Sequence, residues 1–553
     1  MRKHKYLFLL LTVLTLSSCQ TKEYFPIPTQ IGVVEKINLL SDERLKDWHL
    51  KDIQLDSLPG VSLYRAYDSL LVGKKGKEVI VAILDTKLDI HHEDLKGQLW
   101  INKNEIPNNN IDDDDNGYID DINGWNFLGN SNNEDLLYQK YSYLRVVEKY
   151  EAFFKGKKVE DLSVKDSLLY QEYMHANKVL EVKSKKKDSD LAYAVLLLNI
   201  LAESKKEMLK YFSNDKYTLK DLDSLSNLHS NNKKLQNSIL RRSNFMKYGY
   251  TKEYLKEYEL SVFVKYKKML NKSYREREIQ GDDPEKIKDA FYGNNILFGV
   301  VPFKHAIGVS GLLGATRNNN IGLDGFSNYI KIMPVVMVAS GDEHDKDVAL
   351  AIRYAVDNGA QIINMSWGKY FSLHSDWVID AMKYAENKGV LLVTGSGNDA
   401  INNDVEKIYP DDNINGKEFL TNFISVGATE YNVNAQLKSS FSNYGNENVD
   451  VFAPGNNLYT TATNSTYQTG GGTSYASPII AGVAALIWSY YPSLTVSEVK
   501  KIILDSGVKY DLIVNIGTEE KKELVPFSTL SKSGKIVNAY NALIMAEKIS
   551  NKN

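Results

Sequence analysis

Ser474 lies between three glycines and a run of small and apolar residues, in the segment GGGTSYASPIIAGVAALIW that begins at Gly470. The glycines let the backbone turn tightly and approach another group closely. The small residues predict a helix packed deep against its neighbours, with Pro478 in its first turn, where a missing N–H costs nothing. The Ser474 hydroxyl would then lie near unpaired backbone N–H groups, which favour developing negative charge. Acyl-transfer chemistry requires a nucleophile in such a place, although the pattern alone also fits an ordinary serine cap.

The elements that must position such a residue alternate along the chain. Residues 78–85 form a β-branched run that ends at Asp85, and residues 390–398 form another that ends at Asn398. Runs of this kind are typical of strands buried on both faces of a parallel sheet, and open α/β sheets carry their chemistry at the strands' carboxyl ends. Taken alone, Asp85 fits a turn equally well. Further strands are predicted at 329–339 and 361–368, and helices at 346–359 and 377–389, which together indicate a doubly wound parallel sheet.

Several motifs together resemble those of the subtilisin-like (S8) serine peptidases. VAILDTKLDIHHEDL resembles the family's aspartate motif around Asp85, KHAIGVSGLLGA its histidine motif around His305, and GGGTSYASP its serine motif around Ser474. The chain order Asp, His, Ser is that of subtilisin. LLVTGSGND resembles the segment that carries the oxyanion asparagine, here Asn398, and INMSWG the strand that pairs with substrate. The resemblance implies a three-layer α/β/α subtilisin-like domain with a mostly parallel sheet, and substrate-binding roles for Ser366, Trp367 and Gly368.

The same resemblance implies a serine endopeptidase that works through an acyl-enzyme intermediate. His305, with a pKa near neutrality, would accept the proton of the Ser474 hydroxyl, and Asp85 would hold the imidazole tautomer. The Asn398 amide and the Ser474 N–H would meet the oxyanion. No cofactor is needed for this chemistry, and the expected partners are peptide or protein substrates.

The histidine motif departs from the family pattern H-G-T-H-V-A-G. Ala306, Ile307, Gly308 and Ser310 replace Gly, Thr, the second His and Ala, and Lys87 replaces the glycine two residues after Asp85. A catalytically weak or inactive subtilisin-like lipoprotein that binds peptides is therefore the alternative function. A metallohydrolase built on residues 91–94 (HHED) is a third hypothesis, but adjacent histidines lack the i, i+4 spacing of a helical zinc site.

Residues 128–284 differ in composition from the rest of the chain. They hold four of the 35 glycines and one of the 12 prolines, and they carry 30 Lys and Arg against 23 Asp and Glu. Their helical periodicity predicts an insertion that interrupts the α/β domain. Its basic faces fit either solvated helix surfaces or a site for acidic ligands. We expect the insertion to dock on the more acidic remainder as a partial lid.

An acidic loop precedes the insertion. Asp112, Asp114, Asn116 and Asp120 fall at D-x-D-x-N-G spacing, with Gly117 at the sharp turn. Hard oxygen ligands so arranged suit a structural Ca²⁺. The twelfth position is Asn123, where an EF-hand has a bidentate Glu, so a solvated acidic loop is the alternative.

The N-terminus has the pattern of an export signal. A basic pentapeptide, Met1–Lys5, is followed by the short apolar stretch 6–16, which is too short for a spanning helix. The ending Leu-Ser-Ser-Cys resembles a bacterial lipobox, which implies a lipid on Cys19 and anchorage to a bacterial membrane, on the periplasmic side or at the cell surface. Cys19 is the only cysteine, so no disulfide or Cys-ligated metal is expected. A soluble secreted protein is the alternative.

The sequence thus predicts five regions in a chain of 553 residues, whose net charge of −3 gives no reason to expect nucleic acid as a partner. We expect a monomer that touches the membrane only through its N-terminal lipid. The regions are a lipoprotein signal peptide (1–19), an N-terminal tether and mixed segment (20–75), the first part of the peptidase domain (76–127), the helical insertion (128–284) and the second part of the peptidase domain (285–547).

Overall fold

The computed structural model describes residues 30–31, 35–37, 40–288, 292–299, 304–414, 416–518 and 520–552. Its centre is a seven-stranded sheet in which all neighbouring strands run parallel. In spatial order the strands are β10 (Val451–Pro454), β9 (Phe423–Thr429), β6 (Leu391–Gly395), β5 (Ile362–Met365), β2 (Val79–Asp85), β4 (Ile330–Val336) and β3 (Trp125–Asn126).

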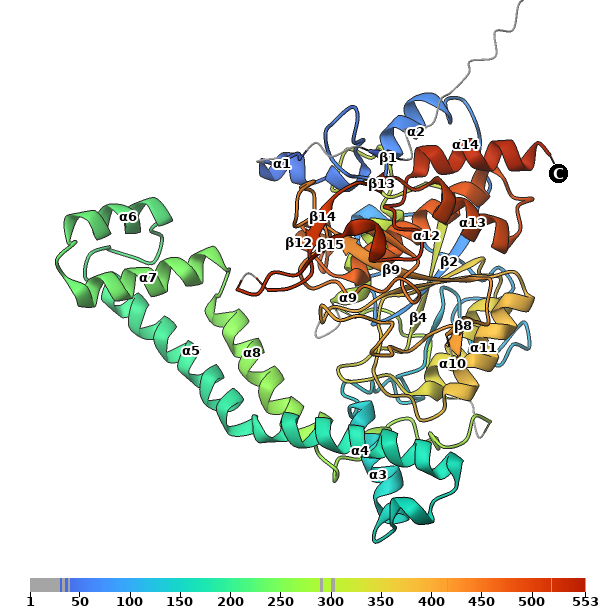
Figure 1. Ribbon diagram of the computed structural model, residues 1–553, viewed down its shortest axis with the longest axis horizontal. Helices are drawn as coiled ribbons and strands as arrows, with labels where there is room; N and C mark the ends of the chain where they lie inside the picture. The colour runs from blue at the N-terminus through green and yellow to red at the C-terminus, as the bar shows by residue number, and fades with distance from the viewer. Residues whose placement is uncertain are drawn as a thin grey trace, which may run out of the picture.

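Helices cover both faces of this sheet and make three layers (Figure 1). Along β2, Val81 and Ile83 belong to one apolar cluster, whereas Ala82 and Leu84 belong to another. Successive side chains of a strand point to opposite faces, so the two clusters are the two sides of the sheet. The first cluster contains α9 (His305–Gly314), α12 (Thr473–Tyr490), α13 (Val496–Ser506) and α14 (Ala539–Ser550), and the second contains α10 (Asp345–Asp357) and α11 (Ser375–Asn387).

This architecture confirms the predicted three-layer α/β/α fold with a parallel sheet. One local expectation was wrong. Pro478 does not lie in the first turn of α12, because the helix begins at Thr473 and Pro478 is its sixth residue. The Pro478 ring removes the N–H that would have bonded to the carbonyl four residues earlier, that of Ser474.

The segment before the first sheet strand is packed into the same body. Trp48, Leu50 and Leu63 are fully buried in the core shared with α12 and α14. Its elements are β1 (Gln30–Ile31), α1 (Asp42–Leu45), a 3₁₀ turn (Trp48–Leu50) and α2 (Leu63–Ser69). The predicted signal sequence and Cys19 lie outside the described residues. Among those described, no helix is both long and apolar enough to cross a bilayer.

Smaller elements complete the body around the sheet. Three antiparallel hairpins, β7–β8, β11–β12 and β14–β15, lie outside the main sheet. Strand β13 pairs with β1 in parallel. Their bounds are β7 (Asn413–Ile414), β8 (Lys417–Glu418), β11 (Leu458–Ala462), β12 (Thr466–Gly470), β13 (Lys509–Tyr510), β14 (Ile513–Asn515) and β15 (Leu524–Pro526).

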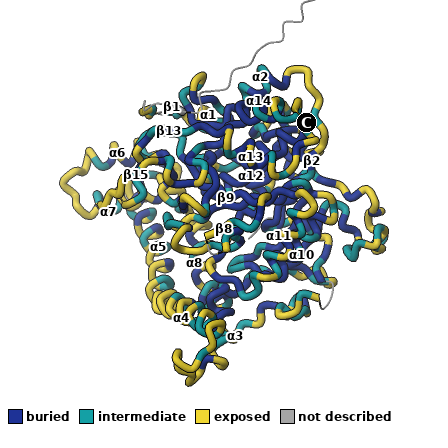
Figure 2. Tube along the Cα trace, turned by 45° about the vertical axis from the view of Figure 1, so that its right-hand side comes forward, coloured by how far each residue is buried: buried dark blue, intermediate teal, exposed yellow. Residues whose placement is uncertain are grey.

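The insertion is mostly helical, as predicted. We call α3 (Ser142–Phe154) and α4 (Val164–Lys185) its base, because they lie against the body, and the four helices beyond them its arm. The arm extends away from the sheet and has α6 and α7 at its far end (Figure 1), and it is far more exposed than the body (Figure 2). Its helices are α5 (Lys187–Met208), α6 (Leu219–Leu228), α7 (Lys233–Lys247) and α8 (Lys252–Val264), followed by a π-turn over Lys265–Met269.

Candidate active site

Asp85 and His305 meet although they lie 220 residues apart in the sequence. Asp85 is the last residue of β2 and is 1% exposed, and His305 is the first residue of α9 with its side chain 36% exposed. Nδ1 of His305 lies 2.9 and 2.8 Å from the two carboxylate oxygens of Asp85. The Thr86 N–H also donates to Asp85, at 2.6 Å. An Nδ1–H that donates to a buried carboxylate leaves Nε2 as the free, basic nitrogen.

The electrostatics of His305 follow from this pairing. Burial lowers the pKa of His305, but the Asp85 charge and its hydrogen bond outweigh burial, and Glu343 adds a smaller effect in the same direction. The net result is a pKa raised above the ordinary value of 6.5. The imidazolium that forms when His305 accepts a proton is therefore stabilised in place.

The altered histidine motif is matched by a change in packing. A Cβ atom at Gly308 would lie 2.7 Å from the Tyr475 hydroxyl, so the small residue makes room for this side chain. The Tyr475 ring stacks with His305 at 6.2 Å between ring centres and 14° between planes. Ala306 keeps a backbone hydrogen bond to the Thr86 hydroxyl at 3.1 Å. Tyr475 follows Ser474 in the sequence, so the histidine and serine motifs are in contact.

Ser474 is the second residue of α12, and Asn398 follows strand β6. The Asn398 carbonyl oxygen accepts hydrogen bonds from the Thr473 N–H at 2.8 Å and the Thr473 hydroxyl at 3.1 Å. This fixes the amide orientation and leaves the Asn398 NH₂ group free to donate. Gly472, which precedes the helix, has φ +151°, a conformation that favours glycine.

A cavity of about 150 Å³, which we call the serine pocket, brings these residues together. Ser474 and Asn398 line it alongside the predicted substrate strand, Ser366–Gly368. Trp367 fixes that strand to β2 by donating its indole N–H to the Leu84 carbonyl at 2.9 Å. The structure thus brings Asp85 to His305, and Ser474 to Asn398 and the strand, at the carboxyl ends of the sheet.

Two polar side chains of the serine pocket were not among the predicted site residues. Tyr370 and Asp399 line it, and the Tyr370 hydroxyl donates a hydrogen bond to the Asp399 carboxylate. Asp399 directly follows Asn398, so adjacency to a predicted site residue was the available signal. Tyr370 lies in a loop without a recognisable pattern.

The acidic loop differs from its prediction. Asp112 accepts from the backbone N–H groups of Asn116 and Gly117, and Asp120 accepts from those of Asn109 and Asn110, so these two carboxylates hold the loop itself. The carboxylates that converge within 4.8 Å of one another are instead those of Glu105, Asp114 and Asp121. Of the four predicted ligands, only Asp114 belongs to this group, and the Asn116 amide donates to Asp121 at 3.3 Å.

The three carboxylates of this acidic group lie in a partly buried, polar environment. Burial raises the pKa of Asp121 to about 6, and the charge of Asp114 adds to the increase. The Tyr354 hydroxyl and the Asn102 amide donate to Asp121, at 2.6 and 2.8 Å. Two buried carboxylates and a third beside them offer the hard oxygen ligands that Ca²⁺ prefers.

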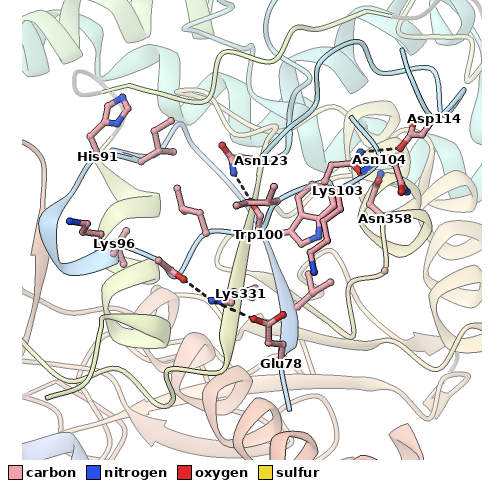
Figure 3. A pocket seen from close by; sticks show the side chains of 18 of the residues that line it. Glu78, His91, Lys96, Trp100, Lys103, Asn104, Asp114, Asn123, Lys331 and Asn358 are labelled. Atoms are coloured by element: carbon pink, nitrogen blue, oxygen red, sulfur yellow. Dashed lines mark hydrogen bonds and ion pairs between the residues drawn. The ribbon is translucent and has the colours of Figure 1, made fainter. Parts of the chain in front are cut away.

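The residues proposed for a metallohydrolase do not form such a group. His92 is buried, with one ring nitrogen 3.0 Å from the Thr466 carbonyl and the other accepting from the Asp94 N–H. His91 lies at one end of a larger cavity of about 1140 Å³ that is also lined by Trp100 and Lys331 (Figure 3). That cavity contains none of the predicted triad residues. Among the described residues, the only His, Cys, Asp and Glu cluster close enough to share an ion is the one at Asp121.

The comparisons with known proteins point to one class. Residues 301–528 match the model of the subtilase family, peptidase S8. The matched range contains His305, Asn398 and Ser474, whereas Asp85 lies before it, on the other side of the insertion. A subtilase-family domain is therefore supported in this chain, together with homology to subtilisin-like proteases.

Two relatives and two solved structures illustrate the similarity. Thermitase of Thermoactinomyces vulgaris is 37% identical over 186 residues, which are 34% of this chain and 61% of the relative. A thermophilic serine proteinase of Bacillus sp. (strain AK1) is 36% identical over 186 residues, 34% of this chain and 42% of the relative. The chain thus spans less than two thirds of either.

The solved structures are proteases as well. Proteases from Pseudoalteromonas arctica PAMC 21717 match with 27% identity and a TM-score of 0.35, over 44% of this chain and 70% of theirs. A cold adapted subtilisin-like serine proteinase matches with 23% identity and a TM-score of 0.33, over 43% of this chain and 74% of its own.

Proposed function

We propose that this chain is a serine endopeptidase that hydrolyses peptide bonds through the triad Asp85, His305 and Ser474. The observation that carries the proposal is the contact of 2.8 Å between His305 and Asp85, at the same sheet edge as the serine pocket. A buried carboxylate hydrogen-bonded to Nδ1 makes Nε2 the base. Ser474 is next to Tyr475, whose ring stacks on the His305 imidazole.

The reaction follows from these roles. His305 Nε2 removes the Ser474 hydroxyl proton as Oγ attacks the carbonyl carbon of the peptide bond. The Asn398 NH₂ group and the Ser474 backbone N–H donate to the oxyanion that forms. When this intermediate collapses, the C–N bond breaks and His305 returns its proton to the leaving amine. Water then attacks the acyl-enzyme by the same base catalysis and releases the acid.

Labelling by a fluorophosphonate tests the proposal directly. The probe should modify the wild-type protein, and Ser474→Ala should abolish both labelling and hydrolysis of a casein substrate without unfolding the protein. Ser497→Ala is a matched control, because Ser497 is also the second residue of a helix, α13, and is exposed. Equal labelling of the Ser474→Ala variant would refute the assignment.

The alternative is a subtilisin-like lipoprotein that binds peptides without cleaving them. It would be favoured if the wild-type protein bound peptides in the serine pocket but neither reacted with the probe nor hydrolysed any substrate. The Asp85–His305 contact argues for catalysis, because a binding site has no need of an oriented base.

We also propose that the acidic group binds a structural Ca²⁺ through Glu105, Asp114 and Asp121. Asp114 is the one ligand shared with the predicted set, and Glu105 and Asp121 are buried carboxylates beside it. The ion would neutralise the repulsion between three carboxylates and would have no part in the catalytic steps.

Finally, we propose that the protein is an exported monomer carried to a bacterial membrane by a lipid on Cys19, facing the periplasm or the cell surface. The support is the sequence Leu-Ser-Ser-Cys after a short apolar stretch. Metabolic labelling with an alkyne fatty acid should mark the wild-type protein and not Cys19→Ser. Release of wild type into the soluble fraction without label would count against the anchor, and light scattering of the purified protein tests the monomer.

A further inference from the structure

A second cavity continues from the serine pocket toward the insertion. It has a volume of about 780 Å³, and we call it the insertion pocket. One wall is the chain Gly368–Phe371, which continues the predicted substrate strand, and the other is formed by α3 and α4. The two cavities share Gly368 and Tyr370 in their linings, so they adjoin.

The base of the insertion is held firmly at this place. Asp342, just beyond strand β4, accepts hydrogen bonds from the Ser142 N–H at 2.8 Å and the Ser142 hydroxyl at 2.5 Å, at the start of α3. The Arg145 guanidinium donates to the Asp342 carbonyl. Earlier in the insertion, the Gln139 N–H donates to the Ser340 carbonyl at 2.7 Å. Helix α3 is therefore joined to the segment that follows strand β4.

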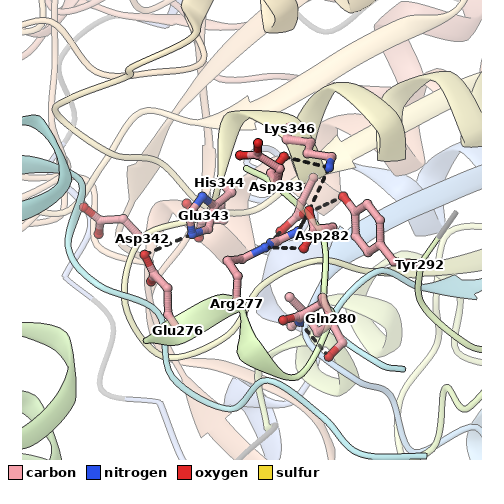
Figure 4. Close-up of polar contacts among 12 residues, drawn as sticks. Glu276, Arg277, Gln280, Asp282, Asp283, Tyr292, Asp342, Glu343, His344 and Lys346 are labelled. Carbon is pink, nitrogen blue, oxygen red and sulfur yellow. Dashed lines mark hydrogen bonds and ion pairs between the residues drawn. The ribbon is translucent and has the colours of Figure 1, made fainter. Parts of the chain in front are cut away.

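The returning end of the insertion is held by a buried ionic network (Figure 4). The Arg277 guanidinium contacts the carboxylates of Asp282 and Asp347 at 2.6 Å each, and the Lys346 ammonium contacts Asp282 at 2.7 Å. All these side chains are at most 6% exposed. Because breaking a buried pair leaves an uncompensated charge, this network holds the returning end of the insertion in place.

Aromatic rings line the insertion pocket near the body. Tyr141 and Tyr143 stack with 5.2 Å between ring centres, and Tyr143 meets Phe371 edge-on at 6.2 Å. On α4, the His175 ring lies 5.1 Å from Phe371. The substrate strand and the insertion therefore share one aromatic wall. Such faces suit the methylene stem and the cation of a long basic side chain.

One carboxylate of the insertion pocket has no partner. Glu172 of α4 is half-buried, and among the described residues it makes no ion pair and accepts no hydrogen bond. Burial raises its pKa, with a smaller contribution from Asp345. By contrast, three lysines of the pocket are paired, Lys265 with Asp190, Lys369 with Asp345 and Lys407 with Asp411.

The other charged side chains of the insertion pocket do not pair with Glu172 among the described residues. Lys183 is exposed on the same helix, eleven residues further along, which is about 16 Å at 1.5 Å per residue. Asp342 accepts from Ser142, and Glu406 is exposed. His175 lines the same pocket three residues from Glu172 on α4, and among the described residues no hydrogen bond or ion pair joins the two. The insertion pocket therefore combines aromatic faces with an unpaired carboxylate that a cation could approach.

A peptide would enter this pocket with a defined direction. The strand runs from Ser366, whose hydroxyl contacts the Ser474 carbonyl at 2.8 Å, outward to Phe371. A peptide that pairs antiparallel with it has its scissile bond near Ser474 and its more N-terminal residues near Phe371. The residues that reach the insertion pocket are thus those before the scissile bond.

We propose that the insertion pocket is a substrate subsite that binds a lysine or arginine side chain located two to five residues before the scissile bond, with Glu172 as its specificity-determining carboxylate. The inference rests on the proposed peptidase function and extends it. The insertion then acts through its base, as part of the substrate groove.

Internally quenched peptides test this subsite. The set places one Lys, Arg, norleucine or Glu at each of these four positions in an otherwise constant sequence. The wild-type enzyme should prefer Lys or Arg at one position, and Glu172→Gln should lower kcat/KM for that peptide by roughly tenfold, the effect of one charge-assisted hydrogen bond. The norleucine peptide should be cleaved equally by both. Glu181→Gln, which removes an exposed carboxylate paired with Lys185 on the same helix, is the control. It should leave kcat/KM unchanged for both the basic and the norleucine peptide.

Charge reversal and binding complete the test. Glu172→Lys should transfer the preference to the Glu-containing peptide, an outcome that a purely structural role of Glu172 would not produce. Binding of the same peptides to Ser474→Ala, measured by fluorescence anisotropy, reads the subsite without catalysis. If fluorophosphonate labels Ser474 but basic and norleucine peptides are cleaved and bound alike, the subsite is wrong and the peptidase stands. If labelling and cleavage fail while the basic peptide still binds through Glu172, the peptidase is wrong and the subsite stands.

Discussion

The Ser366 hydroxyl donates a hydrogen bond to the Ser474 backbone carbonyl at 2.8 Å. In a regular helix that carbonyl would accept from the N–H four residues later, but residue 478 is proline and has none. The freed carbonyl instead holds the substrate strand. The proline inside α12 therefore joins the helix of the proposed nucleophile to the predicted substrate strand.

Ser366→Ala tests this connection. Besides Ser474, the Ser366 hydroxyl contacts the Asn364 amide at 2.9 Å and the Ser477 hydroxyl at 2.8 Å, so its loss leaves buried polar groups without partners. The free energy of unfolding should fall by about 1–3 kcal/mol in urea denaturation. Ser497→Ala should stay within about 0.5 kcal/mol of wild type, as for an ordinary surface change. Equal stability of the two variants would show that the hydroxyl is dispensable.

Asn398→Ala should lower kcat by ~10²–10³, the range seen when a side-chain donor is removed from the oxyanion hole of a subtilisin, with little change in KM. Because the Asn398 oxygen also accepts from the Thr473 N–H, some stability should be lost as well. Asn398→Asp separates the two effects, since it keeps the acceptor oxygen and removes the donor. A defect confined to KM in steady-state kinetics would contradict the assigned role.

The sheet and the positions of Asp85 and Asn398 at its edge could be predicted from the strand pattern for a physical reason, whereas His305 came from the resemblance of its motif to that of a family. Strands buried on both faces leave uninterrupted apolar runs, and their carboxyl ends place Asp85 and Asn398 at one edge. Side-chain direction in loops leaves no such trace. Asp112 and Asp120 accept from backbone N–H groups of the loop, as Glu105 also does, and Glu105 and Asp121 lie close to Asp114 although both are outside the expected spacing.

Two features of the site depend on contacts between distant segments. From the sequence, Gly308 is only a departure from the family's histidine motif. In the structure, the Tyr475 side chain from the serine motif occupies the space that a larger residue at this position would need. Likewise, Glu172 belongs to an unremarkable helical pattern, and only packing places α4 against the substrate strand.

The pH profile of hydrolysis should reflect the raised pKa of His305. The base must be neutral, so kcat/KM should rise with pH through a midpoint above 6.5 and then level off. Asp85→Asn removes the main cause of the shift and should move the midpoint of the residual activity to lower pH, while kcat falls ~10⁴-fold. Burial raises the pKa of Glu343 to about 7, so Glu343→Gln is the comparison and should move the midpoint less.

The same shift has a consequence for stability. A folded-state pKa above the unfolded value contributes stabilisation that is fully present below pH 6.5 and is lost as pH rises through the folded pKa. The free energy of unfolding of Asp85→Asn should therefore lack that component of the pH dependence. Urea denaturation below pH 6.5 and above the folded-state pKa of His305 measures the difference. Parallel curves of unfolding free energy against pH for wild type and Asp85→Asn would contradict the cause assigned to the shift.

Calcium should raise the thermal midpoint of unfolding by a few degrees, because a ligand that binds only the folded state stabilises it. Asp114→Asn with Asp121→Asn should abolish the increase. Asp115→Asn is the matched control, since Asp115 is exposed in the same loop with φ +56°, which asparagine tolerates. Identical melting curves in calcium and in chelator would remove the site. A response of the double variant equal to wild type would place the ion elsewhere.

Removal of the arm tests whether the insertion acts through its base. Residues 191–264 can be replaced by a short Gly/Ser linker, which keeps Asp190 as the partner of Lys265 and Tyr266. The flanking segments are already close, since the Tyr266 hydroxyl lies 3.4 Å from the Lys183 carbonyl. The arm buries apolar side chains mostly within itself, and its ion pair from Glu257 to Lys304 is exposed and worth little. Hydrolysis of a small chromogenic peptide should therefore persist at the wild-type rate.

Selectivity among folded protein substrates should change in this armless variant, because the arm extends beside the body (Figure 1) and its Glu257 pairs with Lys304, the residue before His305. Replacement of residues 135–280 instead removes Ser142 and Arg277 and leaves Asp347 as an uncompensated buried charge, which costs about 3–5 kcal/mol. That longer deletion should unfold at a lower temperature and lose activity. If the armless variant stayed folded but no longer cleaved the small peptide, the arm would be helping to build the catalytic site, and the role assigned to the base alone would be wrong.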